Sequence, residues 1–183
     1  MIILAGVAGS GKSKQGRFLA DEAGYPWLST GELLRVLITG KRRQEMLKGK
    51  LLSDEEVINV FNTVVNLIDT SKEFVLDGFP RTIKQTDWLL EQIHLGRFDL
   101  TAIFHLVASE EVVRSRLESR GRIDDTEEAI NQRFTEFREV TVPILDYFKE
   151  ENIKIIDIDA SLSPQEVHEI IMENLKKFKP TDN

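Results

Sequence analysis

Short apolar runs alternate along the chain with longer segments in which apolar residues recur at helical spacing. Continuous apolar runs are typical of strands buried on both faces of a sheet, whereas recurrence every three to four residues is typical of amphipathic helices. Strands are therefore expected at 2–5, 26–29, 73–77, 101–107 and 153–158. Helices are expected at 12–23, 31–38, 54–70, 83–95, 110–120, 126–149 and 164–178. This alternation predicts an α/β fold with a mainly parallel sheet.

The starts of several expected helices carry capping-box patterns, in which a capping side chain precedes a glutamate by three residues. These pairs are Ser29 with Glu32, Ser53 with Glu56, Asp125 with Glu128 and Ser163 with Glu166. Pro164 follows its cap at the first helical position, where proline is favoured because no backbone N–H is needed there. Pro143 lies inside the 126–149 segment, so a break or bend is expected near it.

A glycine-rich motif directly follows the first expected strand. It reads Gly6-Val-Ala-Gly-Ser-Gly11-Lys12-Ser13 and matches G-x-x-x-x-G-K-[ST] completely. Its glycines let successive N–H groups point at one anion, and the next helix adds its positive dipole end. Lys12 would reach the β- and γ-phosphates, and the Ser13 hydroxyl would bind Mg²⁺. Asp77 ends the third expected strand and would face the same ion, directly or through water, so we expect a nucleoside triphosphate site with Mg²⁺ as cofactor.

Composition narrows the remaining function classes. A length of 183 residues suits one domain with one sizeable core, expected to span 1–183. No cysteine is present, which excludes disulfides and thiolate metal sites. The net charge of -7 argues against broad binding to nucleic acid or to an anionic membrane. The apolar N-terminal run is too short for a secretory signal or a membrane span, so a cytoplasmic location is expected.

Four motifs, in order over about residues 1–160, resemble those of the adenylate kinase family of nucleoside monophosphate kinases. The first three are segments 6–15 and 29–35 and the run Asp77-Gly-Phe-Pro-Arg81-Thr-Ile-Lys-Gln85. The fourth, Gly121-Arg122-Ile-Asp124-Asp125 with Arg133 downstream, resembles the lid hinge of that family. Many families share a phosphate loop, but the Asp-Gly-Phe-Pro-Arg-Thr run after a strand is far more specific.

This resemblance implies a P-loop fold with a five-stranded parallel sheet covered by helices on both faces. It also implies a small acceptor-binding insert at 30–60, a very short lid at 116–126, and transfer from MgATP to AMP giving two ADP, by a monomer. The implied ATP-binding residues are Gly9, Ser10, Gly11, Lys12, Ser13, Lys14, Arg116 and Arg120. The implied AMP-binding residues are Thr30, Arg35, Leu51, Leu52, Gly78, Arg81, Gln85, Arg122 and Arg133. The implied catalytic residues are Lys12, Arg81, Arg120, Arg122 and Arg133.

The arginines of the second half have a physical interpretation of their own. Arg116 and Arg120 are four residues apart on one expected helix, and like charges at that spacing cost about 0.2–0.5 kcal/mol per pair. Phosphate oxygens between the guanidinium groups would reverse that sign, and the arginine fork suits phosphate better than an ammonium does. Arg114 and Arg138 are expected instead to lie on a solvated face balanced by acidic residues.

Gln85 has two interpretations. Its amide would pair with the Watson–Crick edge of adenine, but Thr82-Ile-Lys-Gln85 is also a capping-box pattern, and a side chain used for the helix start cannot also read a base. In the similar UMP/CMP kinases an asparagine would be expected where Thr82 and Gln85 stand, so AMP is the favoured acceptor. A UMP- or CMP-type kinase and a non-catalytic nucleotide-binding regulator remain the alternatives.

The chain also departs from the family pattern. Ser13 and Lys14 stand where the family usually has glycine and threonine, which shifts the hydroxyl and adds a charge near the phosphates. Ala8 replaces a common proline, and only Gly121 separates Arg120 from Arg122. A short lid and a trimmed insert give less cover against water, which would permit ATP hydrolysis as a side reaction.

Overall fold

The computed structural model describes residues 1–40, 52–120 and 126–178, except for the side chain of Arg35. Its strands are β1 (Ile2–Ala5), β2 (Trp27–Ser29), β3 (Val75–Asp77), β4 (Ala102–Val107) and β5 (Ile155–Asp159). All pairings are parallel, in the order β2-β3-β1-β4-β5. The five-stranded parallel sheet predicted from the sequence is therefore confirmed.

The helices alternate with these strands along the chain. They are α1 (Lys12–Ala23), α2 (Thr30–Leu37), α4 (Asp54–Val65), α5 (Ile83–His94), α6 (Glu110–Arg120), α7 (Glu127–Glu136), the π-helix η1 (Phe137–Thr141), α8 (Val142–Glu150) and α9 (Pro164–Lys176). Among the described residues, none of these helices is long and apolar enough to cross a membrane.

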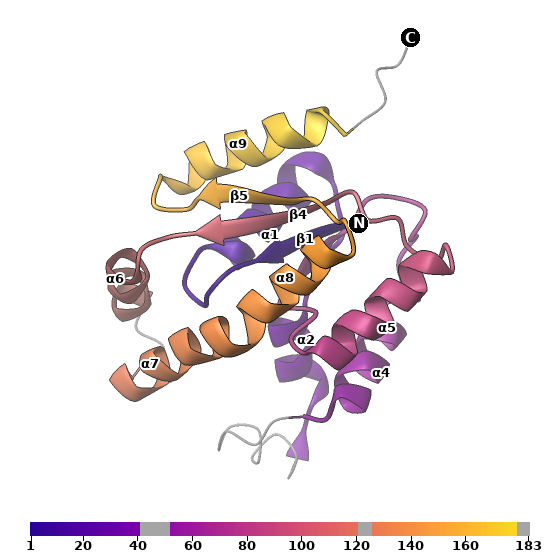
Figure 1. Cartoon of the computed structure of the whole chain (residues 1–183), viewed down its shortest axis with the longest axis horizontal. Coiled ribbons are helices and arrows are strands. Elements are labelled where there is room, and N and C mark those ends of the chain that lie inside the picture. Colours follow the sequence, from indigo (N-terminus) through magenta and orange to yellow (C-terminus); the bar gives the residue numbers. More distant parts are fainter. Residues whose placement is uncertain (41–51, 121–125, 179–183) are drawn as a thin grey trace.

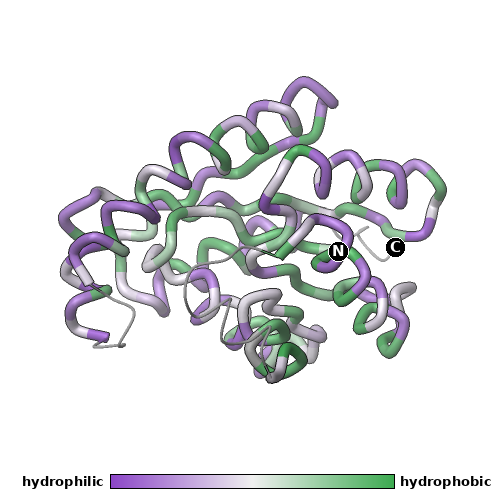
Figure 2. The backbone as a smooth tube through the Cα atoms, turned by 90° about the horizontal axis from the view of Figure 1, so that it is seen from below, coloured by the Kyte–Doolittle hydropathy of each residue, from purple (hydrophilic) through white to green (hydrophobic). Residues whose placement is uncertain are grey.

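Helices cover both faces of the sheet because successive residues of each strand point to opposite sides (Figure 1). Ile2 and Leu4 of β1 pack in one cluster with residues of α1 and α9. Ile3 packs in a second cluster, on the other face, with residues of α4, α5 and α8. Each fully buried aliphatic or aromatic side chain stabilises the fold by about 1.5–3 kcal/mol. Hydropathy alternates along the outer helices, as expected where only one face is buried (Figure 2).

Two of the predicted capping boxes form. Ser53 before α4 and Ser163 before α9 each accept from the backbone N–H three residues on, and the glutamate at that position binds back to the serine N–H. Pro164 occupies the first turn of α9, as predicted. These caps fix where both helices begin because each satisfies two otherwise unpaired N–H groups.

The other two capping predictions are wrong. Within the part of the chain that the structure describes, the Ser29 side chain makes no cap hydrogen bond to α2, and Glu32 pairs with Arg17 of α1 instead. Helix α7 begins after Thr126, whose hydroxyl accepts from Ala129 N. The predicted cap Asp125 itself lies outside the described residues. A hydroxyl one position later performs the same task, which the spacing rule alone does not distinguish.

The expected break near Pro143 takes the form of a π-helical turn. In η1 the Val142 N–H donates to Phe137 O, five residues back, and Pro143 then lies in the first turn of α8, where its missing N–H has no cost. The ring of Phe137 stacks on His105 of β4, with 5.8 Å between ring centroids. The single helix expected at 126–149 is therefore two α-helices joined by η1.

The cap of α9 gives a stability prediction. Ser163→Ala removes the hydroxyl that accepts from Glu166 N, so the free energy of unfolding should fall by about 1 kcal/mol. Urea denaturation at neutral pH measures the change. Ser29→Ala is the matched control, because Ser29 holds the same helix position without a cap bond, and an equal loss in both variants would contradict the assignment.

Candidate active site

The phosphate loop joins the end of β1 to the start of α1. Gly6, Gly9 and Gly11 adopt φ values of +135°, +93° and +106°, a region that side chains rarely enter. A Cβ atom at Gly9 would lie 2.9 Å from Cγ of Leu117 on α6, so glycine is also required for packing. The loop therefore has a backbone that only this glycine pattern can adopt, and it opens directly into the N-terminus of α1.

Lys12 lies at the first position of α1, and its ammonium bends back onto the loop. Its Nζ donates to Gly6 O at 2.7 Å and to Val7 O at 2.9 Å. Part of the side chain keeps contact with solvent, but the protein encloses the ammonium group, and this burial lowers the pKa of Lys12 to about 8. The Asp77 carboxylate opposes the shift, whereas the charges of Arg81 and Arg120 add to it.

The same electrostatics shows which predicted residues come together. Coulomb interactions weaken with distance, so charges that alter the pKa of Lys12 must lie near it. Asp77 and Arg81 reach it from the end of β3, and Arg120 reaches it from the end of α6. The structure thus gathers Lys12, Asp77, Arg81 and Arg120 at the carboxyl ends of the strands, where parallel α/β sheets bind their ligands.

Ser13 and Asp77 form an oxygen pair beside the loop. Ser13 Oγ donates to Asp77 Oδ2 at 2.6 Å, and Asp77 is 4% exposed. Strand register places Asp77 next to Leu4 of β1, directly before the phosphate loop. Hydroxyl and carboxylate oxygens are the hard ligands that Mg²⁺ prefers, so the residues present fit this ion.

The turn after β3 positions Arg81. Gly78 has φ of +79°, and its carbonyl accepts from Arg81 Nε at 2.8 Å. A Cβ atom at Gly78 would lie 2.8 Å from Arg81 Nη2, so the guanidinium packs directly over the glycine. Two further candidates for the acceptor side are Thr30, buried at the start of α2, and Leu52, packed against the core before α4.

The Gln85 side chain is 3% exposed and already makes two hydrogen bonds. Its Oε1 accepts from Arg81 N, and its Nε2 donates to Asp54 Oδ1, each at 2.8 Å. Thr82 caps α5 by accepting from Gln85 N, as the capping pattern predicts, but the Gln85 amide binds Arg81 N instead of completing a capping box. One Nε2–H and one Oε1 lone pair of the amide are left over by these bonds.

Three further arginines lie on α6 and α7. Arg116 donates to Ala160 O at 2.7 Å and to Leu162 O at 3.3 Å, which joins α6 to the segment after β5. Arg114 pairs with Glu110 at 2.7 Å, in agreement with its expected place on a solvated face. Arg133 is half-buried on α7. Two residues of the same helix, one before and one after Arg133 in the sequence, pack in one apolar cluster with Val7 of the phosphate loop.

Three predicted site residues are not tested. Leu51 and Arg122 lie outside the described residues, as does the side chain of Arg35. Asp54 is the residue of this region that sequence reasoning missed. It precedes Gln85 by 31 positions, so no local spacing connects the two.

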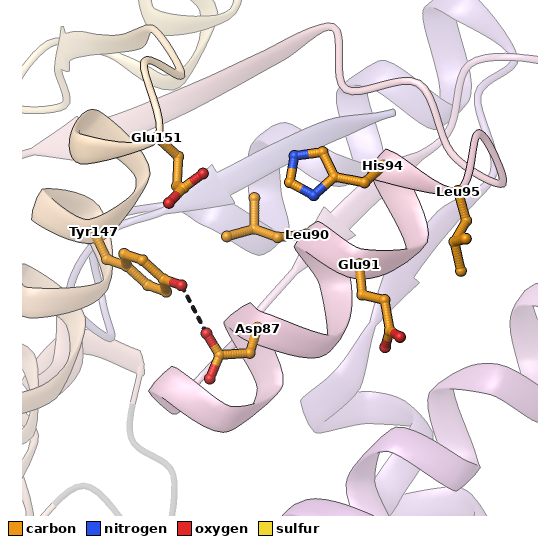
Figure 3. Close-up of a pocket in the computed structure, with 7 residues that line it drawn as sticks. All are labelled: Asp87, Leu90, Glu91, His94, Leu95, Tyr147 and Glu151. Atoms are coloured by element: carbon orange, nitrogen blue, oxygen red, sulfur yellow. Dashed lines mark hydrogen bonds between the residues drawn. The ribbon is translucent and has the colours of Figure 1, made fainter.

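A separate pocket of about 330 Å³ lies between α5 and α8 (Figure 3). Its lining includes Asp87, His94 and Tyr147, and the Tyr147 hydroxyl donates to Asp87 at 2.8 Å. Its lining residues come from α5, α8 and the residues that follow each helix. The phosphate loop is not part of this pocket.

A parallel α/β sheet, a glycine loop that leads into a helix, and a lysine, serine and aspartate beside that loop together define a P-loop nucleotide-binding protein. Comparison of the sequence with known protein families narrows this class. The family model described as adenylate kinase matches residues 4–153. The chain therefore belongs to the adenylate kinase family.

Curated relatives agree over nearly the whole chain. An adenylate kinase of Corynebacterium urealyticum is 37% identical over 182 residues, which cover 96% of this chain and 99% of that protein. One of Agrobacterium fabrum is 33% identical, over 96% of this chain and 97% of its own length. One of Prochlorococcus marinus is 37% identical, over 88% and 91% respectively.

The lowered pKa of Lys12 predicts a pH dependence of stability. Its pKa is about 8 in the folded protein against the ordinary lysine value of 10.5, so the folded state holds fewer protons between these two values and this group adds stability as the pH rises through that window. Between pH 7 and pH 9.5, the free energy of unfolding should therefore rise by about 2 kcal/mol more in the wild type than in Lys12→Met. Urea denaturation at both pH values measures this difference, with Lys14→Met as the control for loss of a charge on the same turn. Parallel curves for the wild type and Lys12→Met would contradict it.

Proposed function

We propose that this protein is an ATP:AMP phosphotransferase that transfers the γ-phosphoryl group of MgATP reversibly to AMP, giving two ADP. The observation that carries the proposal is the gathering of Lys12, Asp77, Arg81 and Arg120 around one phosphate loop. The relatives that cover nearly the whole chain are named adenylate kinase, which supports the same activity.

On the donor side, the loop N–H groups and Lys12 bind the phosphates of ATP. The residues proposed for this side are Gly9, Ser10, Gly11, Lys12, Ser13, Lys14, Arg116 and Arg120. Ser13 and Asp77 would hold Mg²⁺, which neutralises charge on the phosphates when bound. With a pKa of about 8, Lys12 is mostly charged at neutral pH, as phosphate binding requires.

On the acceptor side, the residues proposed to bind AMP are Thr30, Arg35, Leu51, Leu52, Gly78, Arg81, Gln85, Arg122 and Arg133. Arg81 leaves the strand end beside Asp77, so it can hold the acceptor phosphate in line with the donor. Gln85 begins the adjacent helix and can offer its unused N–H and lone pair to the base.

Transfer needs alignment and neutralisation of charge more than covalent help. The attacking oxygen belongs to the phosphate of AMP, which is already an anion, so no general base is needed. Lys12, Arg81, Arg120, Arg122 and Arg133 would balance the charge that spreads over the transferring group. One well-placed arginine contributes about 10³–10⁵ in rate, which is roughly 4–7 kcal/mol of barrier.

The proposed organisation is one domain over 1–183, with an acceptor-binding insert at 30–60 and a short lid at 116–126. Gaps in the described residues fall inside both segments, at 41–51 and 121–125. We propose that the protein acts as a cytoplasmic monomer on free nucleotides (ATP, AMP and ADP) and not on nucleic acid or membranes.

A panel of acceptors tests this function. The protein is mixed with MgATP and each of AMP, UMP, CMP and water alone, and all nucleotide products are quantified. We expect AMP to be converted to ADP with the highest kcat/KM, with slow ATP hydrolysis in the absence of an acceptor. A preference for UMP or CMP would show that the acceptor is a pyrimidine monophosphate and not AMP. ATP binding without transfer to any monophosphate would favour a non-catalytic nucleotide-binding regulator.

Replacing Gln85 tests its role as base reader. Gln85→Ala should raise KM for AMP about tenfold or more while changing KM for ATP much less, because a buried amide hydrogen bond to the base is lost. The same variant should lose stability, since Arg81 N and Asp54 lose a partner. Steady-state kinetics with either nucleotide varied, together with thermal unfolding, separates the two effects. A lower Tm with an unchanged KM for AMP would show that the side chain serves only the helix start.

A further inference from the structure

The beginnings of α4 and α5 meet at one carboxylate oxygen. Asp54 lies in the first turn of α4, and its Oδ1 accepts from both Thr82 Oγ1 and Gln85 Nε2, each at 2.8 Å. Thr82 is the N-cap of α5, and Gln85 lies in its first turn. A negative charge here is favoured by two helix N-termini at once. Asp54 therefore connects the helix that begins in the proposed insert to the residue proposed to read the base.

These contacts determine which way the Gln85 amide faces. A side-chain amide can turn by 180° about its last bond, which exchanges its oxygen and its nitrogen. Here Oε1 accepts from Arg81 N, which can only donate, and Nε2 donates to Asp54, which as a carboxylate can only accept. The turned amide would place donor against donor and acceptor against acceptor. Because Gln85 is 3% exposed, water could not easily compensate for either mismatch.

We propose that Asp54 is a positioning residue that sets base selectivity at the acceptor site by fixing the orientation of the Gln85 amide. The inference rests on the proposed function, in which Gln85 pairs with the acceptor base. The fixed amide presents its free N–H at one position and its free oxygen lone pair at the other, and these positions do not exchange. A base bound in one pose must place an acceptor opposite the N–H and a donor opposite the oxygen.

Adenine and hypoxanthine differ in this order and hardly at all in shape. Adenine accepts at N1 and donates from its 6-amino group, whereas hypoxanthine donates from N1–H and accepts at O6. An amide free to turn would pair with either base, but one held by Asp54 pairs with adenine and meets hypoxanthine donor to donor. AMP and IMP are therefore the matched pair of acceptors for testing the role of Asp54.

The neighbouring carboxylate provides a matched control. Glu55 lies beside Asp54 in the first turn of α4, is exposed, and pairs with Lys84 of α5. It thus carries the same charge and also links α4 to α5, but its partner is a surface lysine. Glu55→Gln removes one negative charge from the same helix turn without touching the amide of Gln85.

The experiment compares wild type, Asp54→Asn and Glu55→Gln. Asparagine keeps the size of aspartate but can donate as well as accept, so Asp54→Asn removes one of the two contacts that fix the amide and leaves only Arg81 N to oppose the turned orientation. We expect the ratio of kcat/KM for AMP to kcat/KM for IMP to fall about ten- to hundredfold in Asp54→Asn, with the dissociation constants of the two monophosphates, measured by calorimetry, changing in the same sense. Glu55→Gln should keep the wild-type ratio. In a Gln85→Ala background, Asp54→Asn should change the ratio no further.

Each contrary result has a separate meaning. A lower Tm in Asp54→Asn with an unchanged AMP to IMP ratio would assign Asp54 a structural role only and overturn the inference. Wild-type protein that transfers phosphate to no monophosphate would refute the proposed function itself, before any variant is compared. The two failures are distinguishable because only the second is seen in the unmodified protein.

A measurement on the wild type keeps the inference testable even if Asp54→Asn does not fold. The side-chain amide signals of Gln85 are identified by NMR through their loss in Gln85→Ala. In a held amide, the proton bound to Asp54 should exchange with solvent more slowly than the side-chain amide protons of exposed glutamines. Rapid exchange of both protons, at the rate of exposed glutamines, would overturn the inference.

Discussion

Repulsion between the buried ammonium of Lys12 and the neighbouring guanidinium groups is the constraint on which the site depends. Burial and the charges of Arg81 and Arg120 lower the pKa of Lys12, so the site holds its positive charges at a cost. Asp77 is the nearby negative charge that opposes this shift. Like charges gathered around a buried ammonium stabilise the fold poorly, but they suit a ligand that brings several negative charges, as a line of phosphates does.

The cluster can persist because rigid packing surrounds it. Val7 of the phosphate loop packs with Val113 and Leu117 of α6 and with residues of α7, so the loop and the helices that carry the arginines share one apolar cluster. The sheet beneath is covered on both faces, which fixes the ends of β1 and β3 relative to each other. These apolar contacts therefore hold in place the backbone from which the charged side chains extend.

Much of the fold and of the candidate site is predictable from local patterns in the sequence. Strands, the phosphate loop, and the caps at Ser53 and Ser163 follow from patterns within a few residues, and the structure has them where expected. The wrong cap prediction at Asp125 has a local cause, because adjacent polar residues compete for one task and Thr126 caps α7 instead. The break expected near Pro143 is present, but the pattern does not specify its π-helical form. The contacts of Arg116 and Asp54 join positions distant in sequence, so no local pattern contains them.

The two halves of the site differ in what a ligand must displace. Lys12 is bound to the carbonyls of Gly6 and Val7, and Ser13 is bound to Asp77, so the proposed binding of a nucleotide and Mg²⁺ requires these hydrogen bonds to be exchanged for new ones. The bonds of Gln85 to Arg81 and Asp54 still leave one donor and one acceptor for a base, so they can persist on binding. Donor binding at this loop would therefore include a local rearrangement, whereas base reading by Gln85, as proposed, would use groups already in place. Preorganisation of this kind lowers the cost of ordering side chains, which favours discrimination among bases on the acceptor side more than on the donor side.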